Sequence, residues 1–181
     1  MDDLVMQAMQ KWPNVPDCYE WLGLDTRGNW YMRDDQAQHK GDFDSGVIGA
    51  KGSLITHAKL ISFIERNYSC DPIGQWYFQN GPQRVYVSLA ATPWIIRIDS
   101  NHSVSTHTGR PAQLRSFLLD ENGMAYANTD LGLGLVHTQD MFNLSQWLEQ
   151  DSWSPLEIHS SELPKLYKFI KKPSPNPSPN T

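Results

Sequence analysis

Hydrophobic residues recur with two different periods along the chain, and each period predicts one kind of element. A spacing of three and four residues predicts helices at Asp3–Trp12, Thr56–Asn67, Asp140–Glu149 and Ser161–Lys172. Alternation of apolar and polar side chains predicts strands at Trp21–Leu24, Asn29–Arg33, Gln75–Gln79, Pro82–Leu89, Pro93–Asp99, Ser116–Leu119, Met124–Ala127 and Gly134–His137. We therefore expect an α+β fold in which antiparallel β-hairpins and small sheets are packed by a few helices.

The sharpest local signal is the dipeptide Asn80-Gly81 between two aromatic strands. Asn-Gly favours a two-residue hairpin turn, because both residues accept a positive φ. This turn predicts that Tyr77 lies directly opposite Arg84 on the neighbouring strand. One face of the hairpin then carries Trp76, Phe78, Gln83, Val85, Val87 and Leu89, which are all apolar except Gln83, and the other face carries Gln75, Tyr77, Gln79, Arg84, Tyr86 and Ser88.

The second face of this hairpin is the candidate binding surface. Tyr77, Arg84 and Tyr86 combine aromatic rings with a guanidinium, and a cation–π contact between Tyr77 and Arg84 is expected. Such a surface suits a protein, a peptide or a small anionic ligand. Three residues of polar segments, Arg33, His107 and Arg110, extend the predicted site. The alternative is that another element covers this face and Arg84 pairs with a carboxylate.

Three segments repeat a pattern of Asp, two residues, Gly, one residue and a strand, namely Asp25–Tyr31, Asp71–Tyr77 and Asp120–Tyr126. Either an internal duplication or convergent turn chemistry explains this repeat. We expect one compact domain over residues 1–172, with possible subdomains at about 17–90 and 91–150. The segment Asp34–Ser53 has no period and is either a binding loop or a disordered surface loop. Residues 173–181 are rich in Pro, Ser and Asn and are expected to be a disordered tail.

The charge balance argues against several classes of partner. The 181 residues contain 15 Lys and Arg against 20 Asp and Glu, which gives a formal net charge of −5. A nucleic-acid-binding protein needs a basic surface that this composition does not supply. No apolar run reaches the roughly 20 residues that cross a bilayer, and Asp2 and Asp3 stand where a signal peptide carries basic residues. We therefore expect a cytoplasmic protein, in which Cys18 and Cys70 are free thiols.

Motifs for catalysis or cofactors are weak in this sequence. The segment Gly46–Ser53 has Ala50 and Gly52 where a phosphate-binding loop requires Gly and a hydroxyl residue. Histidines and aspartates show no metal-ligand spacing, and the nucleophile pattern G-x-S-x-G is absent. The sequence therefore predicts no metal and no cofactor. The leading hypothesis is a non-catalytic binding or adaptor module, and the alternative is a small hydrolase or metal-dependent enzyme that uses His107, His137 and Asp140.

Several motifs resemble those of uncharacterised bacterial proteins of unknown function. They are the pair Gly28 and Trp30, the helix segment Leu60–Ile64, the hairpin segment Asp71–Gln79, and Thr92-Pro93-Trp94 before an alternating strand. The resemblance covers roughly residues 20 to 140. It implies a soluble α+β fold with small antiparallel sheets, and it implies no activity.

Overall fold

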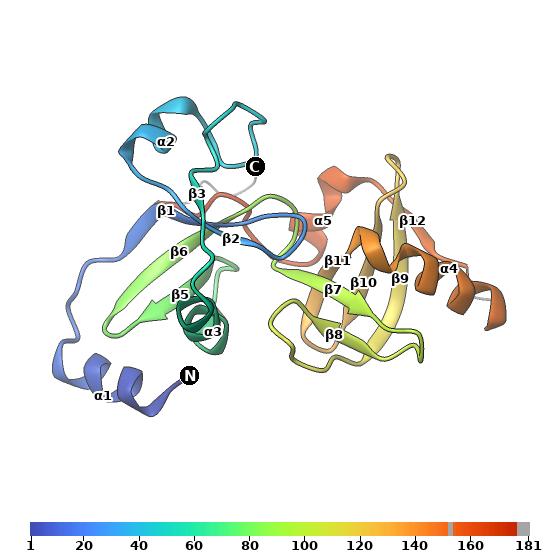
Figure 1. The fold of residues 1–181 in the computed structure, drawn as a ribbon, viewed down its shortest axis with the longest axis horizontal. Coiled ribbons are helices and arrows are strands. Elements are labelled where there is room, and N and C mark those ends of the chain that lie inside the picture. Colours follow the sequence, from blue (N-terminus) through green and yellow to red (C-terminus); the bar gives the residue numbers. More distant parts are fainter. Residues whose placement is uncertain (152–153, 177–181) are drawn as a thin grey trace. The chain divides into compact units, whose positions relative to one another are not determined.

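The computed structural model describes residues 1–151 and 154–176, and it has an α+β architecture as predicted. The chain divides into two compact units (Figure 1). The first unit consists of Met1–Asp25, Asn29–Ala90 and the C-terminal segment from Phe169 onward. The second unit consists of Thr26–Gly28 and Ala91–Lys168.

The first unit is built on a six-stranded sheet with the strand order β3-β2-β1-β6-β5-β4. Its pairs are antiparallel except for β1 and β6, which are parallel. Phe63 of α3 packs edge-on against Phe78 of β5, with ring centroids 5.3 Å apart. The elements are α1 (Asp3–Lys11), β1 (Cys18–Leu24), β2 (Trp30–Met32), α2 (Asp35–Lys40), β3 (Ser53–Leu54), α3 (Ala58–Arg66), β4 (Tyr68–Cys70), β5 (Trp76–Asn80) and β6 (Gln83–Leu89).

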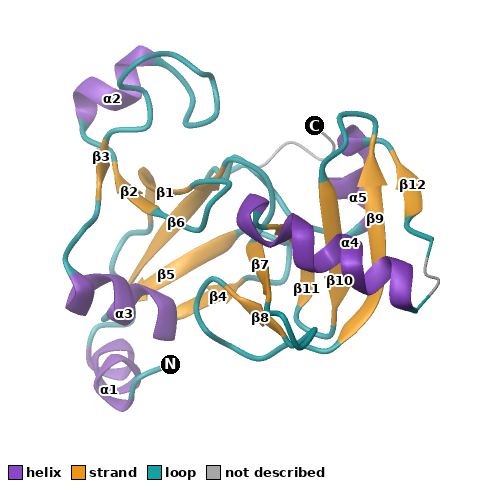
Figure 2. Cartoon of the chain, turned by 45° about the vertical axis from the view of Figure 1, so that its right-hand side comes forward, coloured by secondary structure: helices purple, strands orange, loops and turns teal. Residues whose placement is uncertain are grey.

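The second unit is built on another six-stranded sheet, with the strand order β12-β9-β10-β11-β7-β8. Helix α4 lies along this sheet (Figure 2), where Trp147 contacts Phe117 and Asn143 donates a hydrogen bond to the Ile98 carbonyl at 2.8 Å. The elements are β7 (Trp94–Ile98), β8 (Val104–Thr106), β9 (Leu114–Asp120), β10 (Ala125–Thr129), β11 (Gly132–Val136), η1 (Thr138–Asp140), α4 (Met141–Gln150), β12 (Leu156–Ile158), η2 (Ser160–Glu162) and α5 (Leu163–Leu166).

Both sheets are mixed, which corrects the expectation of purely antiparallel sheets. The parallel pairs are β1 with β6, β11 with β7, and β12 with β9. In the first two pairs, a hairpin is followed by a three-stranded meander whose last strand returns beside the first strand of the hairpin. The hairpin signals identify neighbours along the chain, whereas these pairs join strands that are far apart in sequence.

The two units share one strand topology. In each unit a hairpin (β1–β2 or β7–β8) lies beside a meander (β4–β5–β6 or β9–β10–β11), and the last meander strand is parallel to the first hairpin strand. The registers also agree. Leu24 pairs with Trp30 as Ile98 pairs with Val104, Tyr77 pairs with Tyr86 as Tyr126 pairs with Leu135, and Leu22 pairs with Val87 as Ile96 pairs with Val136. Equivalent residues can therefore be read from the pairing alone.

The repeated Asp-x-x-Gly pattern marks the tight turns of this topology. In each of four turns, an aspartate carboxylate oxygen accepts a hydrogen bond of 2.8–2.9 Å from the backbone N–H four residues later. The aspartate N–H in turn donates to the carbonyl of that residue. The sequence pattern did not identify the turn at Asp99, because His102 stands there in place of glycine and adopts a φ of 62°. The aspartates are Asp25, Asp71, Asp99 and Asp120.

The β5–β6 hairpin forms with a different register from the predicted one. Asn80 pairs with Gln83 and Gln79 pairs with Arg84, so the two-residue turn is Gly81-Pro82 rather than Asn80-Gly81. Proline has no N–H for the ladder and a fixed φ, which places Pro82 in the turn, and Gly81 takes a φ of 57°. Each residue therefore faces a partner two positions later than expected. A shift of two leaves every side chain on its predicted face.

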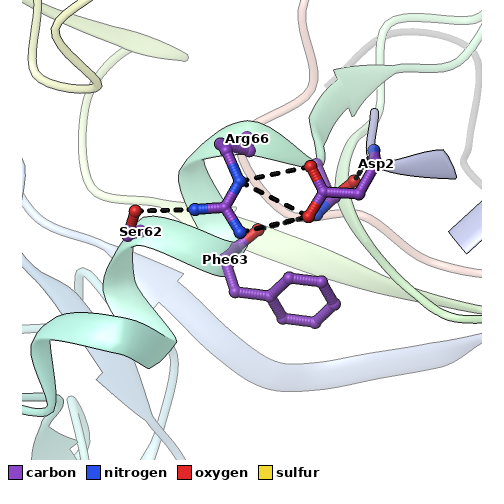
Figure 3. A network of polar contacts seen from close by, with 5 residues as sticks. Asp2, Ser62, Phe63 and Arg66 are labelled. Atoms are coloured by element: carbon purple, nitrogen blue, oxygen red, sulfur yellow. Dashed lines mark hydrogen bonds and ion pairs between the residues drawn. The ribbon is translucent and has the colours of Figure 1, made fainter. Parts of the chain in front are cut away.

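The N-terminal helix is fixed to α3 by a polar network (Figure 3). Arg66 at the end of α3 forms an ion pair with Asp2 at 3.1 Å and donates a hydrogen bond to Ser62 at 2.7 Å. The Asp2 N–H donates to the side-chain carbonyl of Asn67, whose amide donates to the Phe63 carbonyl. These contacts lower the pKa of Asp2, chiefly through the hydrogen bond from Arg66.

The predicted closing helix at Ser161–Lys172 is only partly correct. Helix α5 ends at Leu166, and Lys168 adopts a φ of 53°. Phe169 is then buried, and the Ile170 N–H donates to the Gly74 carbonyl beside the first sheet at 2.9 Å. Pairing with this sheet satisfies the backbone and the apolar side chains, so it replaces the helix that the period predicts.

Part of the predicted tail is also ordered. Pro173 is buried, and the Ser174 N–H donates to the Gln75 side chain at 2.7 Å. Residues 177–181, the remainder of the predicted tail, lie outside the described residues.

Candidate functional site

A pocket of about 220 Å³ opens in the first unit, where several chain segments end together. We call it the Arg33 pocket. Arg33 directly follows β2, and Ser88 and Leu89 are the last residues of β6. The irregular segment after α2 and the ordered C-terminal segment supply the remaining walls. Its lining residues are Arg33, Asp42, Phe43, Asp44, Ser88, Leu89, Lys171 and Lys172.

Arg33 is the most deeply buried charged residue of the pocket lining, with only 2% of it exposed. Its Nε donates to the Ala50 carbonyl at 2.8 Å, and one terminal nitrogen donates to the Gly41 carbonyl at 2.5 Å and to the Ala37 carbonyl at 3.4 Å. The other terminal nitrogen reaches only the Glu20 carbonyl, at 3.5 Å. In residues 1–151 and 154–176, no carboxylate oxygen lies within 4.0 Å of this guanidinium. The buried charge of Arg33 is therefore solvated by carbonyl dipoles and has no counterion among these residues.

The segment after β2 folds around Arg33. The Asp34 side chain caps α2 by accepting from the Ala37 N–H at 2.9 Å, and Gly41 ends the helix with a φ of 140°. The carbonyls of Ala37, Gly41 and Ala50 in this segment accept hydrogen bonds from Arg33. The sequence analysis left Asp34–Ser53 open between a binding loop and a disordered loop, and the hydrogen bonds to Arg33 explain why it is ordered.

Phe43 is an apolar residue of the pocket lining. It is buried, and a Cβ built on Gly23 of β1 would overlap its ring. Glycine at position 23 therefore provides the space that Phe43 occupies. Together with Leu89, Phe43 gives the pocket an apolar side beside the Arg33 guanidinium.

Two ion pairs flank the pocket. Lys171 contacts Asp44 at 2.8 Å, and Lys172 contacts Asp42. The hydrogen bond from Asp42 raises the pKa of Lys172. Because each aspartate has a lysine partner, the lining residues carry one positive charge in excess, and that charge belongs to Arg33.

The predicted surface at Tyr77, Arg84 and Tyr86 is not an open face. Tyr77 and Tyr86 are 7% and 3% exposed, and Tyr19 of β1 stacks on Tyr86 with ring centroids 4.5 Å apart. Burial raises the pKa of Tyr86 to about 12, and its neutral hydroxyl donates to Asp71 at 3.3 Å. The cation–π contact is confirmed, since the Arg84 guanidinium lies 4.9 Å from the Tyr77 ring. These residues form a packed row across three strands, which corrects the expectation of an exposed recognition surface.

The structure places the other predicted site residues in different units. Arg33 lies in the first unit, as described above. His107 and Arg110 lie in the second unit, where both contact the buried Trp94, at 5.8 Å between ring centroids for His107 and 5.6 Å for the Arg110 guanidinium. The His107 Nδ1 accepts from the Ile95 N–H at 3.2 Å. Arg110 is exposed and His107 is partly exposed, while Trp94 is buried.

The residues of the predicted enzyme alternative make structural contacts. His137 caps η1 by accepting from the Gln139 N–H at 3.1 Å. Asp140 accepts from Arg97 at 2.6 Å and from the Ile98 N–H at 3.0 Å. Burial raises the pKa of Asp140, but these two hydrogen bonds outweigh burial and leave it below its usual value. In the part of the chain that the structure describes, no group of three His, Cys, Asp or Glu side chains is placed to hold a metal ion.

Cys70 is a free thiol directly before the turn at Asp71, and it does not have the properties of a nucleophile. Burial, reinforced by Asp71, raises its pKa to about 11. A reactive cysteine needs the opposite shift, because the thiolate is the nucleophile.

Sequence reasoning found Arg33 but missed its neighbours in the pocket. Phe43 and the two aspartates lie in the aperiodic segment, where no pattern marks a side chain as inward. Ser88 was placed on the polar face of β6, but nothing connected it with Arg33. Lys171 and Lys172 were interpreted as the last turn of a helix, so they could not be placed beside residues 42 to 44.

Comparison with known proteins gives a family but no activity. Over residues 1–174 the chain matches the family model DUF2944, described as "Protein of unknown function (DUF2946)". No curated protein is significantly similar to it. Among solved structures, it is similar to a DUF1285 family protein from Silicibacter pomeroyi DSS-3, at 12% identity and a TM-score of 0.45, with 81% of this chain and 84% of that chain covered. Within residues 1–151 and 154–176, no helix has the length and apolar character that a membrane span needs.

The family match agrees with the resemblance found in the sequence, which also pointed to uncharacterised proteins. The chain belongs to the family DUF2944, whose members are proteins of unknown function.

Proposed function

We propose that this protein is a non-catalytic binding module that holds a small anionic ligand in the Arg33 pocket. The observation that carries the proposal is the buried guanidinium of Arg33, which lines a pocket without a carboxylate partner in the described chain. A buried charge is costly unless an opposite charge or a full set of hydrogen bonds compensates it. An anion in the pocket would supply both, because charge-assisted hydrogen bonds to a guanidinium are strong.

The size and lining of the pocket narrow the class of ligand. About 220 Å³ is below the roughly 300–1,000 Å³ of sites that hold drug-sized ligands. The ligand is therefore small, with a carboxylate or phosphate group for Arg33 and room for a short apolar part beside Phe43 and Leu89. A folded protein partner would not enter such a space, so the small-ligand form of the binding hypothesis is the one we adopt.

A cytoplasmic location is part of this proposal. Both cysteines, Cys18 and Cys70, are free thiols, as expected in a reducing compartment.

The proposal is tested by anion-dependent stabilisation. A ligand that binds only the folded state raises Tm as its concentration rises. We expect inorganic phosphate or acetate, titrated at constant ionic strength, to raise the Tm of the wild-type protein. Arg33→Gln should abolish this rise, while Arg110→Gln should leave it unchanged.

A second variant covers the possibility that loss of Arg33 unfolds the loop that it organises. Ser88→Asp places a carboxylate in the pocket lining, where it can neutralise Arg33 from within the chain. We expect a folded variant whose Tm no longer depends on phosphate. Ser105→Asp, which adds the same charge to β8, is the matched control. An equal phosphate-dependent rise in the wild-type protein and in Ser88→Asp would contradict the proposal.

A further inference from the structure

We infer that Lys171 and Lys172 determine the charge selectivity of the Arg33 pocket: they neutralise Asp44 and Asp42, and so allow an anion to bind at Arg33. This inference rests on the proposed function and adds residues that give the site its specificity. Their role is to position charge, and it does not require that either lysine touches the ligand.

The contacts support a neutralising role. Lys171 and Lys172 extend from the C-terminal segment to the two aspartates of the loop that covers Arg33, and both ion pairs lie in the pocket lining. With the lysines in place, Arg33 provides the one positive charge in excess. Without them, two carboxylates face a single guanidinium, and the lining becomes negative. A lining with a net positive charge attracts an anion, whereas a lining with a net negative charge repels it.

The backbone of the C-terminal segment is held independently of the lysine head groups. The Leu89 N–H donates to the Lys171 carbonyl at 2.8 Å, which continues the end of β6. The Ile170 N–H and the Ser174 N–H make the hydrogen bonds described above, and Phe169 and Pro173 are buried. Removing the two lysine charges should therefore leave the segment in place. This separation of backbone anchor from charged head group makes the inference testable.

The test is a cycle of charge variants, with inorganic phosphate as the probe and titration calorimetry at constant ionic strength as the measurement. Lys171→Gln/Lys172→Gln should bind phosphate about tenfold more weakly than the wild-type protein at low ionic strength, as expected when two unit charges are removed from the pocket lining. Adding Asp42→Asn/Asp44→Asn to that variant returns the net charge of the lining residues to +1. The affinity for phosphate should then lie within about threefold of the wild-type value. Lys165→Gln/Lys168→Gln is the control, because it removes two exposed lysines of the second unit that do not line the pocket.

Each outcome separates the two proposals. If the wild-type protein does not bind phosphate or acetate, both the proposed function and this inference are overturned. If Arg33→Gln abolishes binding but the double lysine variant binds phosphate as well as the wild-type protein does, the inference fails and the proposed function stands. If the lysine variant binds weakly and the asparagine pair does not restore binding, the lysines contact the anion directly, and neutralisation is wrong. Far-ultraviolet circular dichroism and urea midpoints show whether each variant is folded.

Discussion

The two units place different chemistry at the same corner of the same topology. In the first unit, the residue after the second hairpin strand is Arg33, whose N–H donates to the Trp21 carbonyl at 2.9 Å. In the second unit, the equivalent residue is His107, whose N–H donates to the Ile95 carbonyl at 2.7 Å. The residue after the paired Val87 or Val136 is Ser88 in one unit and His137 in the other. The strand frame is therefore shared, while the side chains at the corner differ between the two units.

The residues at the two corners make different kinds of contact. The Arg33 side chain lines a pocket and donates hydrogen bonds to carbonyls, whereas His107 and His137 accept hydrogen bonds from backbone N–H groups. A second difference lies at Gly23, whose equivalent is Arg97. Glycine leaves room for Phe43 in the first unit, while Arg97 pairs with Asp140 in the second. The first unit has a pocket because Gly23 leaves space on β1 that the Phe43 ring occupies. The loop that carries Phe43 also brings the charged residues Asp42 and Asp44 to the pocket lining.

The largest expected effect concerns the turn aspartates that the two meanders share. Asp120 is 7% exposed and accepts from two N–H groups and from the Tyr126 hydroxyl at 2.9 Å. Asp71 is half-buried, and its bond from the Tyr86 hydroxyl is longer, at 3.3 Å. Asp120→Ala should lower the free energy of unfolding by about 2–4 kcal/mol and Asp71→Ala by about 1–2 kcal/mol. Urea denaturation measures both. A larger loss at Asp71 would show that the turns are not equivalent as we describe them.

The next prediction tests the difference between the two units at Gly23, whose equivalent is Arg97. Gly23→Ala pushes a methyl group against the buried Phe43, so it should lower the free energy of unfolding by roughly 1–3 kcal/mol. It should also weaken phosphate binding, because Phe43 lines the pocket. In a Phe43→Leu background the smaller side chain leaves space for the added methyl group. The loss in free energy of unfolding caused by Gly23→Ala should therefore be smaller in that background. If that loss is the same in both backgrounds, the ring is not what the glycine accommodates.

The smallest effect is a pH dependence confined to the second unit. Hydrogen bonds from the Ser160 hydroxyl and N–H, at 2.6 and 2.8 Å, lower the pKa of Glu121 to about 2 from its usual value of 4.5. Because the pKa is depressed on folding, this contact contributes fully to stability above pH 4.5 and is lost as the pH falls toward 2. Glu121→Gln should therefore flatten the fall of stability over that range. Urea midpoints at a series of pH values provide the measurement. If the midpoint falls equally with pH in both proteins, the Glu121–Ser160 contact does not contribute to the pH dependence of stability.

The sequence predicted the local elements well and their long-range pairing less well. Period and turn chemistry located α1, α3 and α4, and placed Gly28, Gly74 and Gly123 in turns, where all three take a positive φ. The parallel pairs were missed because nothing in a strand's own residues names a distant partner. The short strands β4 and β8 have three residues each, too few for a period to be read.

The site was predicted in part, for similar reasons. Arg33 was singled out as a basic residue of a polar segment, and it does line a pocket. Tyr77 and Tyr86 were placed on the correct face, but whether a face is open depends on neighbours such as Tyr19, which a single strand pattern does not reveal. The lysines at 171 and 172 were the hardest to place, because tertiary pairing ends the predicted helix before them.

The central claim, that an anion binds at the first corner rather than the second, is tested most directly by mapping a titration residue by residue. Inorganic phosphate would be added to isotopically labelled protein at constant ionic strength, and the amide and Arg Nε–H resonances followed by NMR. We expect saturable shifts at the Arg33 Nε–H and at the amides of Ser88 and Leu89, with none at His107 or His137. Shifts that appear only at the two histidines, or no saturable shift at Arg33, would contradict the account.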